Sequence, residues 1–589
     1  MGKVIIIGIL MTIAICMIFL LTATAVKASD VILDIKDMKM DYIAVEGFEM
    51  LERGEVTISG IGGKYEYTSK YFAYGWIIDA DNRELVWTMQ GDCDDEDQMS
   101  DYLIECEGSI RLAPGRYEAY YFSGSPNYYF SSGYDIDIDD LGEVISLIGD
   151  IFSKDSKKRD TKFEKEDLEE LMFTITTDAD FRTYTPEFHE TENAIVSINQ
   201  PEANEFIKQG FTLERELDLR VYAIGEYSDS YEVFVDGAWI INASTREKVW
   251  TMDKWNTSRA GGATKNRSIR DIIALPPGNY IAYYATDDSH DADEWNSPPP
   301  ADPLNYGMVL SVVNEGDKRF VSNYDDMHNE VEITRLVRVR DDSFEKAGFT
   351  LKEDAKIHIF ALGERSYSDD ELVDYGWITD METMDRVWQM DGDNTGYAGG
   401  AAKNCQFDGV VELKAGNYML YYRTDDSHAY GDWNTAAPFD KRSWGISIFG
   451  VGNDFSEDDF ELVDQFQPGG KVLVDLTGLG NYEEISRSFM IEKNTRVRVM
   501  ALGEGKSRVM YDYGWIENKR TGEVVWEMTY RKTRHAGGAS KNRFAVANLT
   551  LEKGEYTAFF LTDDSHSLER FNASPPDEPE RWGLIVTLK

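Results

Sequence analysis

The stretches Asp374–Met390, DYGWITDMETMDRVWQM, and Leu413–His428, LKAGNYMLYYRTDDSH, decide the fold class of this chain. In both, apolar and polar residues alternate around Trp, Tyr, Ile and Val, and turn-forming residues such as Gly416 and Asn417 separate the alternating segments. Period-two alternation with aromatic and β-branched residues is typical of antiparallel strands. The sequence therefore predicts a domain of short strands, arranged as an antiparallel β-sandwich or jelly roll.

This pair of stretches is written three times in the chain. Trp239, Trp377 and Trp515 mark the same position in the three copies and are 138 residues apart each time. A fixed period of this kind indicates tandem domains. A fourth, divergent copy precedes them: it keeps the strand residues around Trp76 and Trp87 but lacks the AGGAxKN and TDDSH elements of the other three.

The divergent first copy carries an insert where TDDSH stands in the others. Leu141–Phe152 and Phe163–Leu171 within it show helical spacing of apolar residues. The predicted fold class is all-β, with four tandem antiparallel β-sandwich (jelly-roll-like) domains, the first with a helical insert. The predicted domain bounds are residues 30–190, 191–314, 328–452 and 465–589, and polar stretches at 313–318 and 453–459 are predicted linkers.

The N-terminus predicts export. Lys3 precedes an uncharged run, Val4–Val26, and small residues follow near Ala28. This order is typical of a secretory signal peptide, and the run is also long enough for a retained membrane anchor. We expect residues 1–28 to be one or the other, and the rest of the chain to be secreted or to lie at the cell surface or in a periplasm.

Charge narrows the classes of partner. The 589 residues include 60 Lys and Arg against 107 Asp and Glu, a net charge of −47. Such a surface repels phosphate backbones, so nucleic acid is not expected as a partner, and a membrane is expected only through an N-terminal anchor. Cation binding or a neutral, polar ligand suits this charge better.

Four cysteines are too few for a disulfide framework. Cys93 and Cys106 are 13 residues apart and form a pair if the geometry allows it, whereas Cys16 lies in the apolar N-terminal run. Cys405 is expected to be a non-catalytic thiol.

Three polar elements recur almost unchanged in the second, third and fourth domains, beside strands whose sequences have drifted further: AGGAxKN, TDDSH and an aromatic residue followed by Asn. Because binding residues concentrate in loops at strand ends, these elements form the candidate ligand site. The predicted ligand-binding residues are Lys265, Asn266, Asp287, Asp288, His290, Trp295, Asn296, Lys403, Asn404, Asp425, Asp426, His428, Trp433, Asn434, Lys541, Asn542, Asp563, Asp564, His566, Phe571 and Asn572.

Four interpretations of this site stay open. The first is a pocket for a polar ligand such as a glycan or peptide, with an aromatic platform at Trp295 and its counterparts. The second is a structural brace, in which Asp, Thr and Asn cap loops and the double Gly supplies positive φ. The third is a divalent metal bound by Asp and His two residues apart, which share a face of an extended strand; its ligands are Asp288, His290, Asp426, His428, Asp564 and His566. The fourth, an enzyme, lacks a motif, since Asp, Ser and His adjacent on a strand cannot form a triad.

The order of Phe211-Thr212-Leu213, Gly225-Glu226 and Pro277-Gly278-Asn279-Tyr280 resembles the layout of bacterial pre-peptidase C-terminal domains. That resemblance implies small secreted β-sandwiches carried beside enzymes and involved in binding or secretion, and it implies no site residues. The function expected is an exported tandem-repeat binding or adhesion protein, with a glycan, a peptide or a neighbouring surface protein as partner. The alternative is a purely structural surface or envelope array. A ligand-binding array predicts TDDSH loops that face solvent, and a structural array predicts that they are buried.

Overall fold

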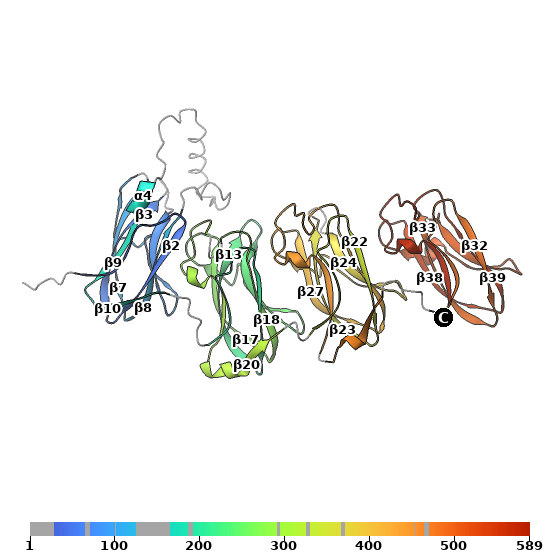
Figure 1. Ribbon diagram of the computed structural model, residues 1–589, viewed down its shortest axis with the longest axis horizontal. Coiled ribbons are helices and arrows are strands. Elements are labelled where there is room, and N and C mark those ends of the chain that lie inside the picture. The colour runs from blue at the N-terminus through green and yellow to red at the C-terminus, as the bar shows by residue number, and fades with distance from the viewer. Residues whose placement is uncertain are drawn as a thin grey trace, which may run out of the picture. The chain divides into compact units, whose positions relative to one another are not determined.

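The computed structural model describes residues 29–64, 71–100, 102–124, 165–186, 193–290, 295–325, 330–366, 371–452, 454–463 and 470–589. These residues form four consecutive β-sandwich modules (Figure 1). The predicted all-β fold class with tandem sandwiches is therefore confirmed. Residues 1–28, the predicted signal or anchor, lie outside the described residues, and so does the predicted helical segment Leu141–Phe152.

The described residues of module 1 form ten strands and one short helix. They are β1 (Asp30–Ile35), β2 (Tyr42–Met50), β3 (Gly54–Lys64), β4 (Tyr71–Asp79), β5 (Leu85–Thr88), β6 (Asp95–Gln98), β7 (Leu103–Leu112), β8 (Gly115–Ser123), α4 (Lys165–Glu170), β9 (Met172–Thr177) and β10 (Phe181–Tyr184). The helix α4 falls inside the predicted helical segment Phe163–Leu171.

Modules 2 and 3 repeat this order of strands. Module 2 comprises β11 (Ala194–Asn199), β12 (Phe206–Leu213), β13 (Leu217–Ser228), β14 (Val233–Asn242), β15 (Lys248–Thr251), β16 (Ser258–Arg259), β17 (Asn266–Leu275), β18 (Gly278–Ala285), β19 (Gly307–Val312) and β20 (Val321–Tyr324), with 3₁₀ turns η2 (Pro303–Asn305) and η3 (Glu315–Phe320). Module 3 comprises β21 (Glu330–Val337), β22 (Phe344–Leu351), β23 (Ala355–Arg365), β24 (Leu372–Asp380), β25 (Arg386–Gln389), β26 (Gly396–Tyr397), β27 (Asn404–Leu413), β28 (Gly416–Arg423), β29 (Gly445–Val451) and β30 (Phe460–Val463), with η5 (Lys441–Ser443) and η6 (Glu457–Asp459).

Module 4 ends the chain. It comprises β31 (Val472–Thr477), β32 (Glu484–Ile491), β33 (Thr495–Lys506), β34 (Val509–Met510), β35 (Tyr513–Asn518), β36 (Val524–Glu527), β37 (Arg534–His535), β38 (Asn542–Leu551), β39 (Gly554–Leu561) and β40 (Gly583–Leu588), with η7 (Tyr530–Lys532) and η8 (Pro579–Arg581). Its strands form a six-stranded sheet, with β31-β40-β33-β38-β37 as its main path, and a four-stranded sheet, β32-β39-β35-β36. All strand pairs between these elements are antiparallel.

In modules 2 and 3 the two sheets are joined at one corner. In module 3 the end of β23 pairs with the start of β24, so that Glu364 lies opposite Asp374. The same corner in module 2 places Glu226 opposite Asp236. This corner becomes the candidate site below.

Modules 2 and 3 extend past their predicted ends. The strand β20 pairs with β12, and β30 pairs with β22, so the polar stretches predicted as linkers lie inside the modules. Their short 3₁₀ turns carry charged residues at the surface, which is why composition alone suggested a linker.

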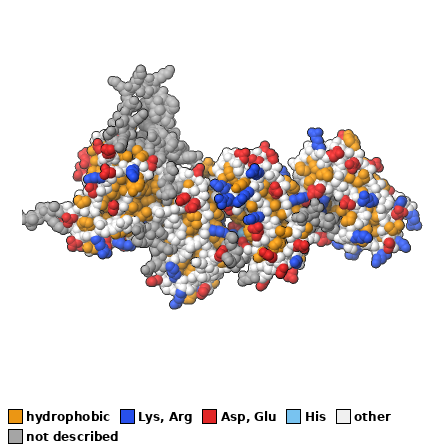
Figure 2. Space-filling view, viewed as in Figure 1, with side chains coloured by type: hydrophobic (Ala, Val, Ile, Leu, Met, Phe, Trp, Pro, Cys, Tyr) orange, Lys and Arg blue, Asp and Glu red, His pale blue; other side chains and the backbone are white. Residues whose placement is uncertain are grey.

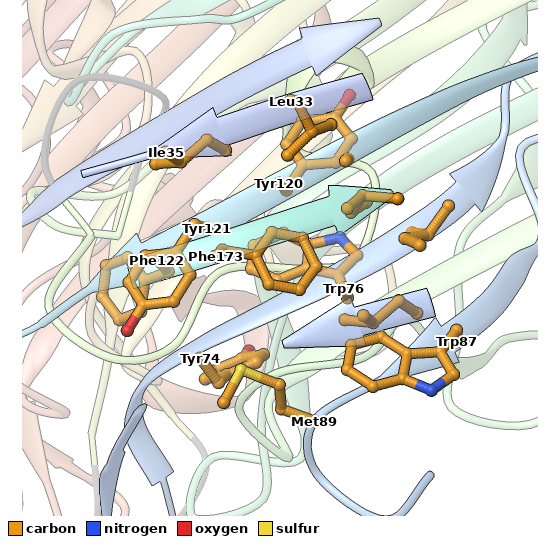
Figure 3. Packing of buried hydrophobic residues seen from close by; sticks show 14 of the residues in the cluster. Leu33, Ile35, Tyr74, Trp76, Trp87, Met89, Tyr120, Tyr121, Phe122 and Phe173 are labelled. Atoms are coloured by element: carbon orange, nitrogen blue, oxygen red, sulfur yellow. The ribbon is translucent and has the colours of Figure 1, made fainter. Parts of the chain in front are cut away.

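Each module buries an aromatic core between its sheets. In module 1, Trp87 stacks on Phe173 with ring centroids 5.9 Å apart (Figure 3). On the β4–β8 pair, Trp76 stacks on Tyr120 at 5.3 Å. This second stack recurs in every module, as Trp239–Tyr283, Trp377–Tyr421 and Trp515–Phe559.

Cys93 and Cys106 form a disulfide, with Cα atoms 5.6 Å apart, as the sequence predicted. Cys405 is a buried free thiol whose pKa is raised to about 12, chiefly by burial, so it is inert.

The chain divides into two compact units. Modules 1 and 2 belong to the first unit, and modules 3 and 4 to the second apart from the segments Ala398–Ala402 and Thr435–Asp440. On the face shown in Figure 2, acidic and basic side chains are interspersed. No helix among the described residues is both long and apolar enough to span a bilayer.

Candidate functional site

The three recurring elements meet at the sheet-joining corner in modules 2 and 3, and at the equivalent place in module 4. AGGAxKN leads into β17, β27 and β38, and TDDSH follows β18, β28 and β39 directly. Each of these six strands pairs beside the corner, where Glu226, Glu364 or Glu504 stands opposite the Asn that starts β17, β27 or β38. The topology thus brings the predicted site residues of each module together.

A buried His–Asn pair lies at the centre of the site. His290 Nε2 is 2.6 Å from Asn266 Oδ1, and the corresponding distances are 2.6 Å in module 3 and 2.5 Å in module 4. All six side chains are at most 1% exposed. In module 2, Asn266 Nδ2 donates to the carbonyls of Gly261 and Pro298, so its Oδ1 must accept, and His290 carries its proton on Nε2.

Burial keeps these histidines neutral. The pKa of His428 and of His566 is lowered to about 4, mainly because burial disfavours the charged ring and secondly because Lys403 or Lys541 lies nearby. The pKa of His290 is lowered well below its usual value for the same reasons.

The predicted metal pairing of Asp and His was wrong in its premise. The segment after β18 leaves the extended conformation: His290 has a left-handed backbone, with a φ of 62°. His428 and His566 have the same backbone conformation, with φ values of 61° and 62°. The His side chain therefore turns inward, while the preceding acidic residue, Asp288, Asp426 or Asp564, points to solvent and is exposed. Because the backbone is not extended here, residues two apart in sequence do not point to the same face.

The Lys of AGGAxKN and the Asn that follows the aromatic residue bind each other and do not line an open pocket. Lys403 Nζ donates to Glu364 Oε1 at 2.8 Å and to Asn434 Oδ1 at 2.7 Å. Modules 2 and 4 repeat both contacts, through Lys265 with Glu226 and Asn296 and through Lys541 with Glu504 and Asn572. Lys403 is only 5% exposed.

The predicted aromatic platform is packed edge-on into the site. Trp295 is 6% exposed and lies 4.8 Å from the ring of His290 and 5.1 Å from that of Tyr306. Trp433 and Phe571 contact His428 and His566 in the same way. Trp295 is buried and the other two rings are partly buried, so the aromatic residue supports the histidine more than it faces a ligand.

The second Gly of the motif is required by a close approach of two loops. Gly262, Gly400 and Gly538 have φ values of 60–67°, and a Cβ at each would lie 1.9 Å from a carbonyl oxygen of the loop carrying Pro299, Ala437 or Pro575. No other residue fits there. Together with the buried His–Asn pair, this geometry makes most of the motif a brace between loops.

Sequence reasoning missed two carboxyl groups at the corner. Glu364 and Asp374 were not singled out, and Asp425 was placed in the loop without its partner: its backbone N–H donates to Asp374 Oδ1 at 2.8 Å. The same bond occurs in modules 2 and 4, from Asp287 to Asp236 and from Asp563 to Asp512. The available signal was the recurrence, in these three modules, of Gly-Glu and of an Asp three residues before Trp239, Trp377 and Trp515.

Burial raises the pKa of these carboxyl groups. The pKa of Asp374 rises to about 8 and that of Asp512 to about 7, in both cases first because of burial and then because of nearby acidic groups. In module 2, burial raises the pKa of Glu226 to about 7. Strongly shifted groups that recur at one place mark it as a functional candidate.

Asn542→Ala is expected to destabilise module 4 by about 2 kcal/mol, because His566 loses its acceptor and two carbonyls, of Gly537 and Ser574, lose their donor. Calorimetry of the full chain should show the module-4 transition about 8 °C lower. Asp564→Ala, on the exposed position of the same loop, is the control and should shift it by less than about 2 °C. Equal shifts for the two variants would contradict the brace.

No known family model and no curated protein matches the chain. Among solved structures, the chain is similar to the CUB1-EGF-CUB2 domain of human MASP-1/3, at 11% identity and a TM-score of 0.14, covering 44% of this chain and 98% of that one. It is also similar to a structure of the CBM32-1, CBM32-2 and M60 catalytic domains of Clostridium perfringens ZmpB, at 8% identity and a TM-score of 0.12, covering 66% of this chain and 53% of that one. Likenesses with TM-scores this low leave the family and the function of the chain open.

Proposed function

We propose that the protein is an exported surface array of β-sandwich modules, in which the shared loops brace each module and, within each compact unit, contact the module before it. The observation that carries this proposal is a junction that occurs at equivalent positions within both compact units. It joins module 2 to module 1 and module 4 to module 3.

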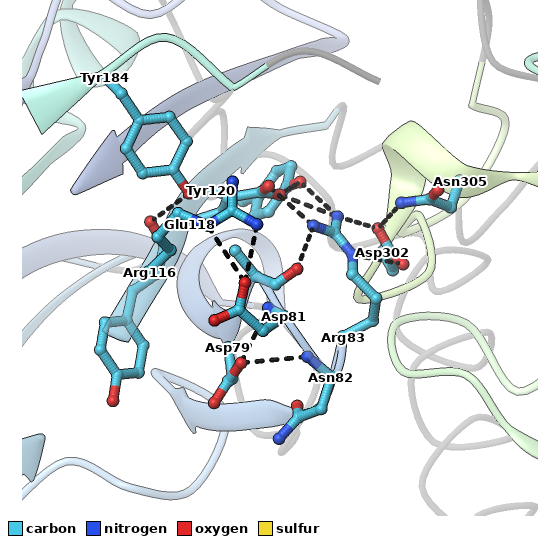
Figure 4. Close-up of polar contacts among 12 residues, drawn as sticks. Asp79, Asp81, Asn82, Arg83, Arg116, Glu118, Tyr120, Tyr184, Asp302 and Asn305 are labelled. Carbon is cyan, nitrogen blue, oxygen red and sulfur yellow. Dashed lines mark hydrogen bonds and ion pairs between the residues drawn. The ribbon is translucent and has the colours of Figure 1, made fainter. Parts of the chain in front are cut away.

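In the first unit, Asp302 of module 2 meets the Trp76–Tyr120 side of module 1 (Figure 4). Arg83 Nε donates to Asp302 Oδ2 at 3.0 Å, and its two terminal nitrogens donate to the carboxylate of Glu118 at 2.7 and 2.8 Å. Trp76 Nε1 donates to the carbonyl of Ala301 at 2.7 Å. As whole residues, Glu118 and Asp302 are at most 4% exposed, so both carboxylates are buried in the junction.

In the second unit, Asp577 and Glu578 occupy the places of Ala301 and Asp302. Asp577 pairs with Arg386, whose guanidinium lies 4.5 Å from the ring centre of Trp377, and Glu578 accepts a hydrogen bond from Tyr421. Although Trp377 and Tyr421 match Trp76 and Tyr120 by position, the charged partners differ. A junction kept at one place with different side chains favours a structural role for the loop.

The junction between modules 3 and 4 is tested by a double-mutant cycle in the full chain. Arg386→Ala and Asp577→Ala are each expected to lower the module-4 transition, and the double variant to lose about 1 kcal/mol less than the sum, because the pair is still partly exposed to solvent. The matched control is the cycle of Lys414→Ala and Asp354→Ala, an exposed pair within module 3. These two substitutions should show no coupling in their effects on stability. Additive losses at Arg386 and Asp577 would remove the support for a built junction.

A second candidate function, binding of a polar ligand such as a glycan or peptide, is favoured by one observation. Asp288, Asp426 and Asp564 are exposed at the same place in three modules, so that weak sites there gain avidity. Binding of the full chain to immobilised glycans and peptides tests it. A specific signal that the triple variant Asp288→Asn, Asp426→Asn, Asp564→Asn abolishes would support it, whereas a signal that the variant keeps would exclude these loops.

The remaining properties belong to the same proposal. Export rests on the N-terminal segment 1–28, and a role without catalysis rests on the inward-facing, fully bonded histidines. Protein partners at the surface, rather than nucleic acid, suit the net charge of −47.

A further inference from the structure

We propose that the corner of module 3 is a divalent-cation site, selective for Ca²⁺, formed by the carboxylates of Glu364, Asp374 and Asp425. Each contributes a ligand oxygen, and the three oxygens lie within 4.8 Å of one another. Oxygens bound to one Ca²⁺ at about 2.3–2.6 Å can be at most about 5 Å apart, so one ion can reach all three.

Two of these carboxylates each have a buried oxygen with nothing to bind it. Glu364 is 6% exposed and Asp374 is not exposed at all. Lys403 binds Glu364 Oε1, and the Asp425 N–H binds Asp374 Oδ1, but neither Glu364 Oε2 nor Asp374 Oδ2 has a hydrogen-bond partner among the described residues. A buried carboxylate oxygen without a partner costs several kcal/mol, and a bound cation removes that cost.

The charges at the corner leave room for a divalent ion. Three carboxylates face one ammonium group, Lys403, which Glu364 Oε1 and Asn434 already engage. Asp341 adds a fourth acidic group: its charge raises the pKa of both Asp374 and Glu364, after burial as the main cause. Ligands that are all oxygen favour Ca²⁺ or Mg²⁺ over transition metals, and Ca²⁺, which tolerates irregular geometry, suits three carboxylates from two strands and a loop better than Mg²⁺, which demands a near-ideal octahedron.

The four modules differ in how free the carboxylates at the corner are to bind a cation. Module 4 has the same three groups, Glu504, Asp512 and Asp563, but Trp582 Nε1 binds Asp512 Oδ2 at 2.9 Å. In module 2, Tyr306 takes the equivalent oxygen of Asp236 at 2.6 Å. In module 3 the equivalent Trp444 does not bind Asp374, and Asp341 is present where modules 2 and 4 have Ala203 and Leu479.

Module 1 has lost the whole set together. Gly63, Ala73 and Gly124 occupy the positions of the three carboxylates. A single glycine explains how the carboxylates are held elsewhere: a Cβ at Gly363 would lie 2.2 Å from the carbonyl oxygen of Asp374, so only Gly allows β23 and β24 to approach. The structure therefore assigns cation binding to module 3 first, to module 4 more weakly, and not to module 1.

The test titrates the full chain, stripped with a chelator, with CaCl₂ alone, followed by isothermal titration and scanning calorimetry. We expect one dominant site with a Kd on the order of 10⁻⁴ M and a module-3 transition that rises with Ca²⁺ while that of module 1 stays fixed. Asp374→Asn and Glu364→Gln should each weaken this binding by about 10-fold or more. Glu364→Gln keeps an acceptor for Lys403, so it carries the test if Asp374→Asn does not fold.

The matched control is Asp393→Asn, which removes one charge from an exposed acidic loop of the same module and should leave the affinity unchanged. Two results would overturn the proposal. The first is no heat and no shift with about 1 mM CaCl₂ in the unaltered chain, which would mean that Asp374 pairs with Trp444 in solution. The second is loss of binding in Asp393→Asn but not in Glu364→Gln, which would place the ion in the Asp391–Asn394 loop.

Discussion

Arg83→Ala is expected to lower the stability of the joined modules 1 and 2 by about 3–5 kcal/mol, because it leaves two buried carboxylates without their shared cation. Arg83 binds Glu118 of its own module through both terminal nitrogens and Asp302 of the next module through Nε. Its side chain is 17% exposed, and those of its partners are 6% and 4% exposed. Scanning calorimetry of the full chain should show the transition of these modules about 10 °C lower.

Arg116→Ala is the matched control for this result. Arg116 belongs to the same module and pairs with Asp81, but both side chains are about half exposed, and such pairs contribute less than about 1 kcal/mol. Arg83→Lys keeps the charge without the planar fork and should fall between the two. If Arg83→Ala and Arg116→Ala shift the transition equally, Arg83 does not hold the junction.

The sequence predicted the all-β modules because strand patterning is local. Alternation around Trp377 and Tyr421 places one face of each strand inward, and the 138-residue period shows that the same domain is repeated. The ends of modules 2 and 3 were harder to place. Their last strands, β20 and β30, are four residues long and pair with β12 and β22, far away in sequence. Their short polar pattern is the same as that of a linker.

The recurring residues do come together in the structure, but their side chains are not oriented as predicted. Recurrence identified Asn266 and His290, yet recurrence constrains buried braces as strongly as ligand contacts. The direction of the His290 side chain depends on a left-handed φ, which no pattern in the neighbouring residues predicts. Asp374 was not predicted because it lies near the start of a core strand, where an acidic residue is typical of an ordinary strand end.

The junction could not be predicted from the sequence for a different reason. Arg83 and Asp302 are 219 residues apart, and modules 3 and 4 form the matching contact from Arg386 and Asp577 instead. Both contacts are Arg–Asp pairs, but they use positions of the repeat that are not equivalent, so their common place is visible only in three dimensions.

His566→Gln is expected to change the pH dependence of module 4 by about 3 kcal/mol between pH 6.5 and 4. The pKa of His566 is about 4 in the folded module and 6.5 in the unfolded chain. A group whose folded pKa is lowered stabilises the fold fully above its unfolded pKa, and this contribution is lost as the pH falls through 6.5 toward 4. Multiplying the 2.5-unit shift by about 1.36 kcal/mol per unit gives this loss.

The neighbouring carboxyl group acts in the opposite direction. Burial raises the pKa of Asp512 from 3.8 to about 7, so its contribution is present at low pH and is lost as the pH rises toward 7. The raised pKa of Glu504, also caused mainly by burial, adds to the same trend. In the unaltered module the folded state holds a proton on Asp512 while the unfolded state holds one on His566, so the two trends oppose each other between pH 4 and 6.5.

The variant separates the two trends. Glutamine donates to Asn542 Oδ1 as the imidazole does but does not titrate, so His566→Gln should leave only the carboxyl trend, and module 4 should gain stability as the pH falls. The measurement is the module-4 transition of the full chain in chelator at several pH values, with module 1, which has no histidine between residues 30 and 184, as the internal reference. Because any constant cost of the substitution shifts all points equally, the slope alone decides. Parallel pH curves for the variant and the unaltered chain would show that His566 is not held neutral by burial.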